Sequence, residues 1–251
     1  MLDLLTGENF NHNTNSILWK TIDTIYPPFC YSCGAIGFEI CPECFDRIQT
    51  IPSEDICLFC GSQLDHNGKC VNQGKHIDYP FEQARSWGFY DGPLKQALRK
   101  IKYDRGFGLL KHFAQPLADF IEHWGITFDF IVPVALGSQR KIERGYNQSE
   151  CIARPVAKLL GHPIIPGALT RTRETRSQVG LNIDQRKHNV AGAFSADYEN
   201  CKSKNILLFD DITTTFSTLI ASTSALLSAG AYSVYCFTVA RTSFQQEKEK
   251  K

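Results

Sequence analysis

The chain has 251 residues, of which 43% are hydrophobic and 21% charged, with a formal net charge of +1. This length can bury a sizeable core and predicts one main domain with a smaller module. No apolar run approaches the ~18 residues of a membrane span. The N-terminal stretch MLDLLTGENFNHNTNS lacks a basic region, which argues against a signal peptide, so we expect a soluble cytoplasmic protein.

The chain is predicted to divide into four parts. Residues 1–26 are interpreted as a polar tail followed by a short amphipathic helix, which Pro27-Pro28 ends. Residues 27–78 form a cysteine-rich module, residues 79–242 the main domain, and residues 243–251 a charged tail.

Seven of the ten cysteines lie between positions 30 and 70. The first four form two CxxC pairs with a short loop between them. In a cytosolic chain this spacing favours metal over disulfides, and four thiolates can surround one zinc ion tetrahedrally. We therefore expect a zinc site made of Cys30, Cys33, Cys41 and Cys44. So short a segment buries little apolar area, and zinc would supply much of its folding free energy.

Three further cysteines, Cys57, Cys60 and Cys70, predict an incomplete second zinc site. Either His66 or His76 is a candidate for the fourth ligand. An arrangement in which the first and third CxxC pairs share a metal stays open as well. The spacing alone does not decide between one zinc ion and two.

The main domain predicts an α/β fold. Apolar segments of buried-strand type alternate with helical patterns, which is typical of a parallel sheet flanked by helices. Residues 161–195 are rich in Gly, Pro and Arg, and a loop of this length is usually functional or mobile. Strands are expected at residues 84–90, 128–134, 206–209 and 234–240, and helices at residues 94–101, 110–124, 148–160 and 216–229.

The stretch ILLFDDITTTFSTL (206–219) places two adjacent carboxylates, Asp210 and Asp211, at the end of a predicted buried strand. In parallel α/β sheets, ligands bind beyond the carboxyl ends of the strands. The start of the next helix can cradle a phosphate with backbone N–H groups and hydroxyls. Adjacent carboxylates can accept hydrogen bonds from sugar hydroxyls. The stretch predicts a site for a phosphorylated sugar; the alternative, in which these residues only cap the helix, stays open.

This stretch resembles the phosphoribosyl-diphosphate loop of type I phosphoribosyltransferases, and further blocks resemble the ComF branch of that family. VPVALGSQRKIERGYNQSECIAR (132–154) is similar to the branch's block ending in Arg-Gly-Phe/Tyr-Asn-Gln. RTRETRSQVGLNIDQRKHNVAGAF (171–194) is similar to its block ending in Arg-x-x-Asn-Val, and an N-terminal paired-CxxC zinc finger is usual there. The resemblance runs from about residue 27 to 241. It implies a type I phosphoribosyltransferase-like parallel sheet flanked by helices, with a small N-terminal zinc-binding module.

The resemblance also implies roles for individual residues. Asp210 and Asp211 would bind the ribose 2′- and 3′-hydroxyls as the catalytic pair, with Mg²⁺ bridging pyrophosphate and ribose oxygens. The remaining candidates for binding phosphoribosyl diphosphate fall into three groups. They are the 5′-phosphate loop Thr213, Thr214, Thr215, Phe216, Ser217 and Thr218; the pyrophosphate cations Arg140, Lys141 and Arg144; and Gln178 and Arg186 on a closing loop.

Phe216 departs from the family pattern, because it stands where the loop has a glycine. Glycine lets the backbone approach a phosphate and take conformations that a side chain resists. A phenylalanine with negative φ can occupy the first turn of a helix, with its ring turned away from the phosphate. We expect phosphate binding to be weakened, lost or reshaped, and the sequence does not decide whether the chain is an active enzyme.

A basic middle segment supports a second class of function. Residues 92–190 have 16 Lys and Arg against 8 Asp and Glu, which attracts nucleic acid or other anions. Cations with interleaved aromatic rings suit a single strand, although a solvated helix face explains them equally well. The candidate DNA-binding residues are Lys95, Arg99, Lys100, Lys102 and Arg105, with Tyr103 and Phe107 between them.

The ComF resemblance implies a site for phosphoribosyl diphosphate and a role in handling single-stranded DNA during natural transformation, with other competence proteins as candidate partners. Two alternatives stay open. One is a catalytically degenerate, zinc-containing nucleic-acid-binding module. The other is an active purine- or pyrimidine-type phosphoribosyltransferase, in which catalysis would come from positioning and charge stabilisation of the leaving pyrophosphate.

Overall fold

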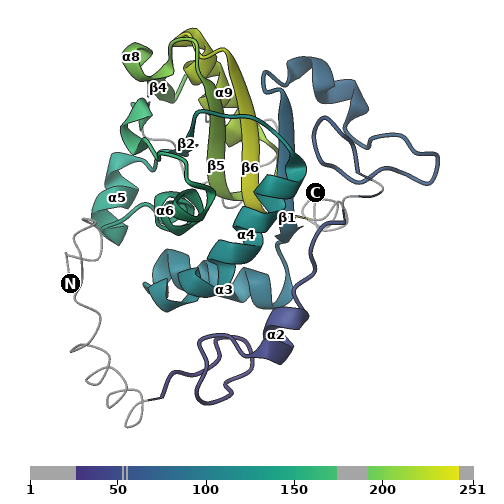
Figure 1. The fold of residues 1–251 in the computed structure, drawn as a ribbon, viewed down its shortest axis with the longest axis vertical. Coiled ribbons are helices and arrows are strands. Elements are labelled where there is room, and N and C mark those ends of the chain that lie inside the picture. Colours follow the sequence, from purple (N-terminus) through teal and green to yellow (C-terminus); the bar gives the residue numbers. More distant parts are fainter. Residues whose placement is uncertain (1–26, 53, 55, 174–191, 243–251) are drawn as a thin grey trace.

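The computed structural model describes residues 27–52, 54, 56–173 and 192–242. A four-stranded parallel sheet in the order β1–β6–β5–β2 forms its centre (Figure 1). The strands are β1 (Gln83–Phe89), β2 (Phe130–Pro133), β5 (Asn205–Thr213) and β6 (Ser233–Arg241). The predicted α/β fold class, a parallel sheet flanked by helices, is confirmed.

Helices cover both faces of this sheet. Helices α3 (Gly92–Tyr103), α4 (Leu110–Trp124) and α6 (Gln148–Leu160) pack on one face, and α9 (Ser217–Ser228) packs on the other (Figure 1). Side chains of a strand point alternately to the two faces. Leu207 and Phe209 of β5 therefore join the core around α3, α4 and α6, whereas Ile206 and Leu208 join the core beside α9. Burial on both faces explains why this strand is a continuous apolar run.

The predicted strand at residues 206–209 is longer in the structure. Strand β5 continues to Thr213 because β6 is equally long and pairs with it, Asp210 opposite Thr238 and Thr213 opposite Arg241. Asp210 and Asp211 therefore lie within the last part of the strand, not beyond its end. The carboxyl ends of the strands point toward α3 (Figure 1).

Several short elements were not predicted. They are α5 (Ser138–Arg144), α8 (Tyr198–Cys201), the 3-10 turns η3 (Phe107–Leu109) and η4 (Pro166–Ala168), and an antiparallel pair of β3 (Leu169–Arg171) and β4 (Phe194–Ala196). Helix α5 buries none of its residues and so has no apolar stripe to detect. Strands of three residues are too short to show alternation. The two strands bracket residues 174–191, which lie outside the described part of the chain.

The cysteine-rich segment contacts the main domain at two places. Residues 27–51, here called the first module, contain α2 (Pro42–Asp46) and lie next to α3 and α4 (Figure 1). Residues 56–78, here called the second module, end in the 3-10 turn η2 (Gln73–Asp78) and lie beside β1 (Figure 1). Near the end of the first module, Gln49 O accepts a 2.9 Å hydrogen bond from Phe89 N at the end of β1. The helix predicted at residues 16–25 and the tail at 243–251 lie outside the described residues.

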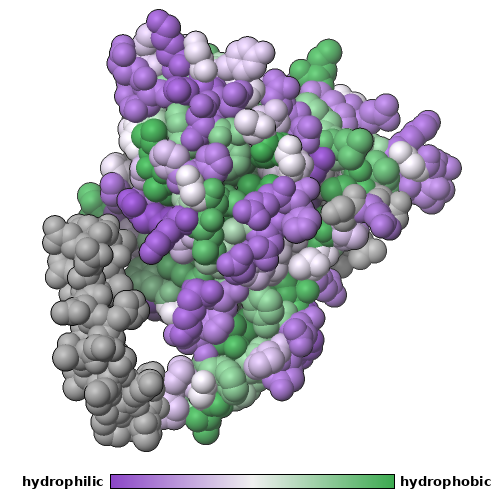
Figure 2. Space-filling view, in the orientation of Figure 1, coloured by the Kyte–Doolittle hydropathy of each residue, from purple (hydrophilic) through white to green (hydrophobic). Residues whose placement is uncertain are grey.

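Hydrophilic side chains cover much of the face seen in Figure 2. Hydrophobic side chains gather at its lower end, where the first module lies and where Phe29, Ile36 and Phe38 are exposed. Among the described ranges, no helix combines the length and the apolar character that crossing a bilayer requires.

Candidate functional site

The two acids of the predicted sugar site lie side by side near the end of β5, and both are buried, with 7% exposure for Asp210 and 5% for Asp211. Asp210 Oδ1 accepts a 2.7 Å hydrogen bond from Ser149 Oγ and a 2.9 Å hydrogen bond from Asp211 N. Asp211 Oδ1 accepts a 2.9 Å hydrogen bond from Ile212 N. These bonds hold both carboxylates in defined orientations at the carboxyl edge of the sheet.

Ser149 is positioned by the start of α6, which follows the loop after β2. The side chain of Asn147 caps this helix, accepting a 3.2 Å hydrogen bond from Ser149 N, and its Nδ2 donates to Val134 O at 2.9 Å. One asparagine thus ties the helix start to the strand next to β5. Sequence reasoning did not assign a role to Ser149 or Asn147, although an N-cap asparagine before a helical pattern is a recognisable sign.

Burial makes Asp210 an unusually weak acid. Removal from water, followed by the charge of the neighbouring Asp211, raises the pKa of Asp210 from 3.8 to about 8. The cation paired with Asp211 is Lys102 from α3, whose Nζ lies 3.9 Å from Asp211 Oδ2. Within the described residues, Asp211 Oδ2 accepts no hydrogen bond. In the described part of the chain, Asp211 Oδ2 therefore has no hydrogen-bond donor, and Asp210 gains or loses its proton at a pH near its pKa of about 8.

Phe216 lies at the N-cap of α9 with φ +60° and ψ −4°. This is the left-handed conformation that glycine favours, and not the negative φ with which a phenylalanine could occupy the first turn of a helix. The ring is 3% exposed and packs on Tyr79 and Phe81, with centroids 5.4 and 5.8 Å away. The guanidinium of Arg241 lies 5.4 Å from its centroid. The phenylalanine thus adopts a glycine-like backbone conformation and buries its side chain beside the second module.

The other predicted loop residues surround Phe216 in sequence. Thr213 and Ser217 are buried, and Thr215 Oγ1 lies 2.9 Å from Ser217 Oγ. Thr214 is half-buried between the strand and this hydroxyl pair, and Thr218 lies in the first turn of α9. The segment thus places a series of hydroxyls at the start of a twelve-residue helix.

The three cations predicted for the pyrophosphate all lie on α5, after the loop that follows β2. Arg144 Nη1 donates a 3.0 Å hydrogen bond to Gln148 Oε1, and its guanidinium lies 5.2 Å from the ring centroid of Tyr103. Lys141 is exposed and Arg140 is half-buried. Gln178 and Arg186, predicted on the closing loop, lie outside the described residues.

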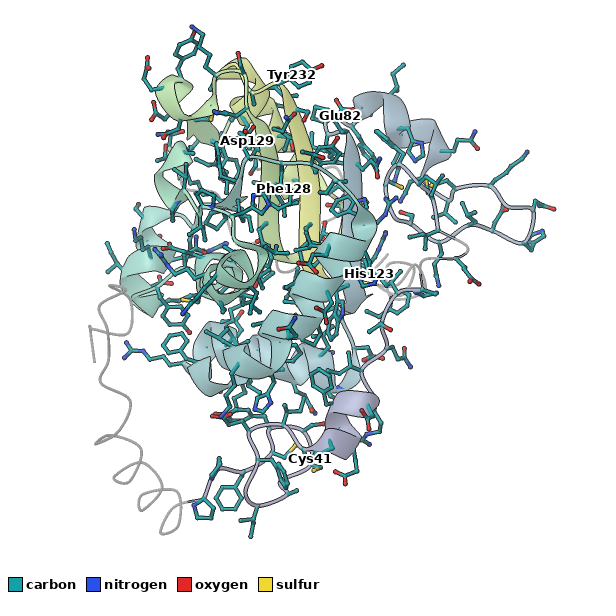
Figure 3. The ribbon with its side chains drawn as sticks, in the orientation of Figure 1. Cys41, Glu82, His123, Phe128, Asp129 and Tyr232 are labelled. Carbon is teal, nitrogen blue, oxygen red and sulfur yellow. The ribbon has the colours of Figure 1, made fainter. Side chains whose placement is uncertain are left out.

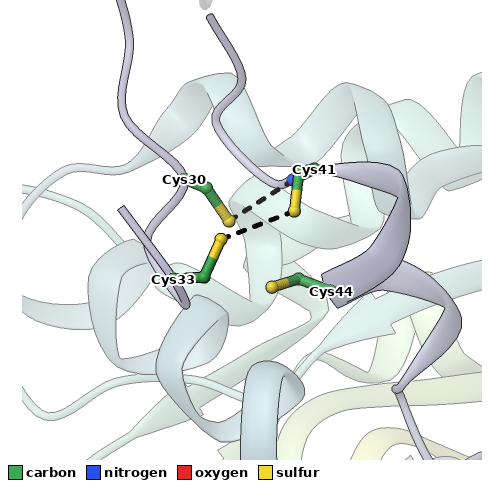
Figure 4. Close-up of side chains that lie close together, drawn as sticks. All are labelled: Cys30, Cys33, Cys41 and Cys44. Carbon is green, nitrogen blue, oxygen red and sulfur yellow. Dashed lines mark hydrogen bonds between the residues drawn. The ribbon is translucent and has the colours of Figure 1, made fainter. Parts of the chain in front are cut away.

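The first four cysteines meet in one cluster (Figure 4). Their sulfurs all lie within 4.8 Å of one another, and Cys33 and Cys41 Sγ are 3.6 Å apart. A tetrahedral zinc with bonds of ~2.3 Å requires sulfurs ~3.8 Å apart. Cys41 N donates to Cys30 Sγ at 3.4 Å, and Arg47 Nη2 lies 2.9 Å from Cys44 Sγ. Such donors stabilise thiolates, so the residues present fit zinc.

The second set of cysteines is completed by His76. Its Nε2 lies 3.3 Å from Cys70 Sγ and 3.8 Å from Cys57 Sγ, while Cys60 and Cys70 Sγ are 3.5 Å apart. These four ligand atoms also lie within 4.8 Å of one another. His66, the other candidate, is exposed and contacts Asn67. The described residues therefore form two separate four-ligand centres, and the arrangement in which the first and third CxxC pairs share a metal is wrong.

The first module is fixed to α4 by Glu39. Glu39 Oε2 pairs with Lys111 Nζ at 2.8 Å and with His112 Nε2 at 3.1 Å. A Cβ atom at Gly108 would lie 1.8 Å from Glu39 Oε1, so a larger residue there would require the Glu39 side chain to move. Phe45 packs on Phe113 with centroids 5.8 Å apart. These contacts bring the first module next to the basic helix α3.

Cations and aromatic rings from three segments meet around the end of α3. Lys100 Nζ lies 5.1 Å from the ring centroid of Tyr31 in the first module, and Tyr103 has Lys102 at 5.9 Å and Arg144 at 5.2 Å. The rings of Phe107 and Tyr146 meet edge to face at 4.8 Å. We call this set the basic–aromatic surface; it comprises Tyr31, Lys100, Lys102, Tyr103, Arg105, Phe107, Arg144 and Tyr146.

The predicted DNA-binding cations are not equally placed on this surface. Lys100, Lys102 and Arg105 belong to it, and the Arg105 guanidinium lies 3.7 Å from where a Cβ of Gly145 would be. Lys100 also pairs with Asp104 at 2.9 Å. Lys95 lies 6.0 Å from the ring centroid of Tyr90, and Arg99 is exposed on the same helix. Tyr31, Arg144 and Tyr146 were not among the predicted DNA-binding residues, because they are distant from α3 in sequence.

Comparison with known proteins identifies relatives along most of the chain. A family model described as a double zinc ribbon domain matches residues 21–72. The DNA utilization protein YhgH of Escherichia coli (strain K12) is 28% identical over 229 residues, covering 86% of this chain and 98% of that protein. Competence protein ComFC of Bacillus subtilis (strain 168) is 25% identical over 253 residues, covering 96% and 95%. Among solved structures, a purine phosphoribosyltransferase from Pyrococcus horikoshii Ot3 aligns with a TM-score of 0.32 and 16% identity over 54% of this chain and 84% of that chain.

Proposed function

We propose that this chain, a ComF-like protein with a phosphoribosyltransferase-type fold and an N-terminal zinc module, binds phosphoribosyl diphosphate at the carboxyl edge of its parallel sheet. The observation that supports this most strongly is the buried acid pair, in which Ser149 orients Asp210 and the glycine-like backbone of Phe216 follows at the start of α9. The acids provide acceptors for the ribose hydroxyls. The helix start provides N–H donors and a dipole for the phosphate.

Charges around the pair suit a ligand that carries a diphosphate. Lys102 beside Asp211 and the cations of α5 provide positive charge on the side of α3. The carboxylate oxygens are hard ligands of the kind magnesium prefers, and Mg²⁺ would enter together with the diphosphate. The oxygen acceptors at this edge of the sheet therefore suit the ribose hydroxyls of the ligand, and the cations suit its diphosphate.

Titration calorimetry with phosphoribosyl diphosphate, with and without Mg²⁺, tests the proposal. The zinc-loaded chain should release heat, and Asp210→Asn and Asp211→Asn should each weaken binding by about tenfold or more, because each replaces a carboxyl oxygen with an amide nitrogen that cannot accept a hydrogen bond. Asp129→Asn is the matched control, since Asp129 pairs with Lys204 at the other end of the sheet. Absence of heat from a folded, zinc-loaded chain, with no recovery in Phe216→Gly, would reject the proposal.

We further propose that the basic–aromatic surface binds single-stranded DNA. The names of two relatives refer to DNA utilization and competence, and the surface joins partly exposed cations to rings on which bases can stack. The Lys100–Asp104 pair is partly exposed and therefore weak, so a phosphate can replace the aspartate. This function does not require that the sugar site be catalytic.

Fluorescence anisotropy with a labelled oligonucleotide, repeated at several salt concentrations, tests the second proposal. Phosphate contacts release counterions, so affinity should fall with salt. Lys100→Ala combined with Arg105→Ala should reduce the slope of log affinity against log salt by about 1 to 2. Lys204→Ala, at the other end of the sheet, should leave the slope unchanged. A salt-independent signal that the double variant does not alter would exclude this surface.

A further inference from the structure

The second module and the phosphate loop are connected by a continuous cluster of rings. Phe59, between the ligands Cys57 and Cys60, lies 4.9 Å from the ring centroid of His76 and 5.6 Å from that of Phe81. Phe81 and Tyr79 then pack on Phe216, at 5.8 and 5.4 Å. His76 also contacts Tyr79, with centroids 6.0 Å apart, so the ring of this metal ligand is two aromatic contacts away from Phe216, the N-cap of α9.

A second connection runs through Arg241 at the end of β6. Its Nη1 donates a 2.7 Å hydrogen bond to Gly61 O, its Nη2 donates a 2.9 Å bond to Ser62 Oγ, and its guanidinium faces Phe216. Ser62 Oγ lies 3.2 Å from the ligand sulfur of Cys60. Arg241 is 9% exposed, so these contacts are shielded from solvent.

The second module packs closely against β1, and this holds both the ring contacts and the Arg241 hydrogen bonds in place. Gly61 has φ +64°, and a Cβ atom there would lie 2.7 Å from Ala84 O. Ala84 N donates a 2.8 Å hydrogen bond to Phe59 O. Within the module, by contrast, the described regular structure is limited to the isolated bridges Ile56–Gln63 and Leu64–Cys70 and the turn η2, and four potential metal ligands lie within 4.8 Å of one another. Its internal order therefore depends on the metal.

Phe216 needs this support because a side chain disfavours the left-handed region. A residue in such a conformation persists only where its surroundings determine it. For Phe216 those surroundings are Tyr79, Phe81 and Arg241, each held by the second module. A glycine at this position would need no such support.

We infer that the Cys57/Cys60/Cys70/His76 centre holds the loop before α9 in its glycine-like conformation, so that metal binding at this centre controls the loop. The expected change in ligand affinity rests on the proposed phosphoribosyl diphosphate site, whereas the expected change in the loop does not. The first centre is a built-in comparison, because it packs on the core of α3 and α4 on the other side of the sheet.

The test compares loss of each metal centre in the full chain. His76→Ala and Cys33→Ser should each lose one zinc ion per chain, measured by native mass spectrometry. In His76→Ala, hydrogen exchange of amides in residues 213–218 should accelerate by about tenfold or more, with β5 upstream of Asp210 still protected. In Cys33→Ser the same amides should exchange at the wild-type rate. Loop exchange unchanged by zinc loss in His76→Ala, or equally accelerated in Cys33→Ser, would overturn the inference.

Two further variants test whether loop exchange depends on the ring contacts and not on a general loss of stability. Tyr79→Leu should retain both zinc ions and still accelerate loop exchange, because it interrupts the ring contacts. Phe216→Gly should make loop exchange insensitive to His76→Ala, because glycine needs no aromatic support. If Phe216→Gly stays as sensitive as the wild type, or Tyr79→Leu has no effect, the inference fails.

Ligand titration then distinguishes this inference from the proposed function. Phosphoribosyl diphosphate with Mg²⁺ should bind His76→Ala about tenfold more weakly than Cys33→Ser, a difference of about 1.4 kcal/mol. If the wild type binds no phosphoribosyl diphosphate but its loop exchange still follows zinc at the second centre, the proposed site fails and the inference stands. If the wild type binds and His76→Ala binds equally well with unchanged loop exchange, the inference fails and the site stands.

Discussion

Ser149 Oγ donates a 2.7 Å hydrogen bond to Asp210 Oδ1, joining the first turn of α6 to the end of β5 across 61 positions of the sequence. Both residues are buried, and the acceptor is the acid that the sequence singled out for a ribose hydroxyl. Of the neighbouring acid, Asp211 Oδ1 accepts a hydrogen bond from Ile212 N, whereas Asp211 Oδ2 accepts none in the described part of the chain. The bond from Ser149 makes the orientation of the acid pair depend on how α6 begins.

We expect Ser149→Ala to weaken both folding and ligand binding. Removing the hydroxyl leaves Asp210, among the described residues, with the backbone donor of Asp211 alone, and a buried acceptor that loses a partner costs about 1–3 kcal/mol. Urea unfolding measures the loss, and calorimetry should show weaker binding of phosphoribosyl diphosphate. Ser222→Ala is the control: Ser222 is fully buried and, in the described part of the chain, its hydroxyl has no partner. A smaller loss in Ser149→Ala than in Ser222→Ala would contradict this role.

The raised pKa of Asp210 predicts a stability that falls with pH. Its pKa is about 8 in the folded chain because of burial and the charge of Asp211, against 3.8 for the free side chain. Between these values the folded state holds a proton that the unfolded state has released. Unfolding therefore releases a proton there, and the free energy of unfolding declines as pH rises, by at most about 1.4 kcal/mol per pH unit.

Urea titrations from about pH 6 to about pH 8 measure this decline. Asp210→Asn should show a shallower dependence on pH than the wild type, because the amide does not titrate. Asp129→Asn, whose acid is partly exposed, should follow the wild-type curve. Parallel curves for the wild type and Asp210→Asn would show that Asp210 is ionised throughout this range.

Each chain should bind two zinc ions. His76→Ala should retain one ion, whereas His66→Ala should retain both, because His66 is exposed and outside either cluster. Native mass spectrometry counts the ions directly. Removing both with a chelator should unfold residues 28–75, since short segments of this kind derive their folding free energy from the metal. Two ions in His76→Ala would exclude it as a ligand.

Tyr103 should contribute to DNA binding through stacking. Its ring is 60% exposed between Lys102 and Arg144, and loss of one stacked base costs about 1–3 kcal/mol. Tyr103→Ala should therefore weaken binding of a labelled oligonucleotide by about fivefold or more, with an unchanged salt slope. Tyr232→Ala is the matched control, because Tyr232 is 78% exposed at the opposite end of the molecule from Cys41 and the first module (Figure 3). Equal effects of the two variants would argue against a stacking role.

Most of the regular elements were predictable because their signals are local. The apolar runs of β5 and β6 and the one-sided faces of α3 and α4 follow from periodicity, and the CxxC pairs follow from ligand spacing. The second centre was only partly predictable, since two histidines satisfied the same spacing. The choice of His76 depends on the turn η2, which brings its ring next to Phe59 and Cys70.

The sequence by itself determined the parallel α/β class, the two adjacent acids near a strand end, and the thiol ligands, because each depends on residues close together in the chain. Only the tertiary structure decided the left-handed conformation of Phe216, the bond from Ser149 to Asp210, and the meeting of Tyr31 with Lys100. Each of these joins segments that are far apart in sequence. The energy that holds a strained backbone or orients a buried acid comes from such distant neighbours, and no local pattern records them.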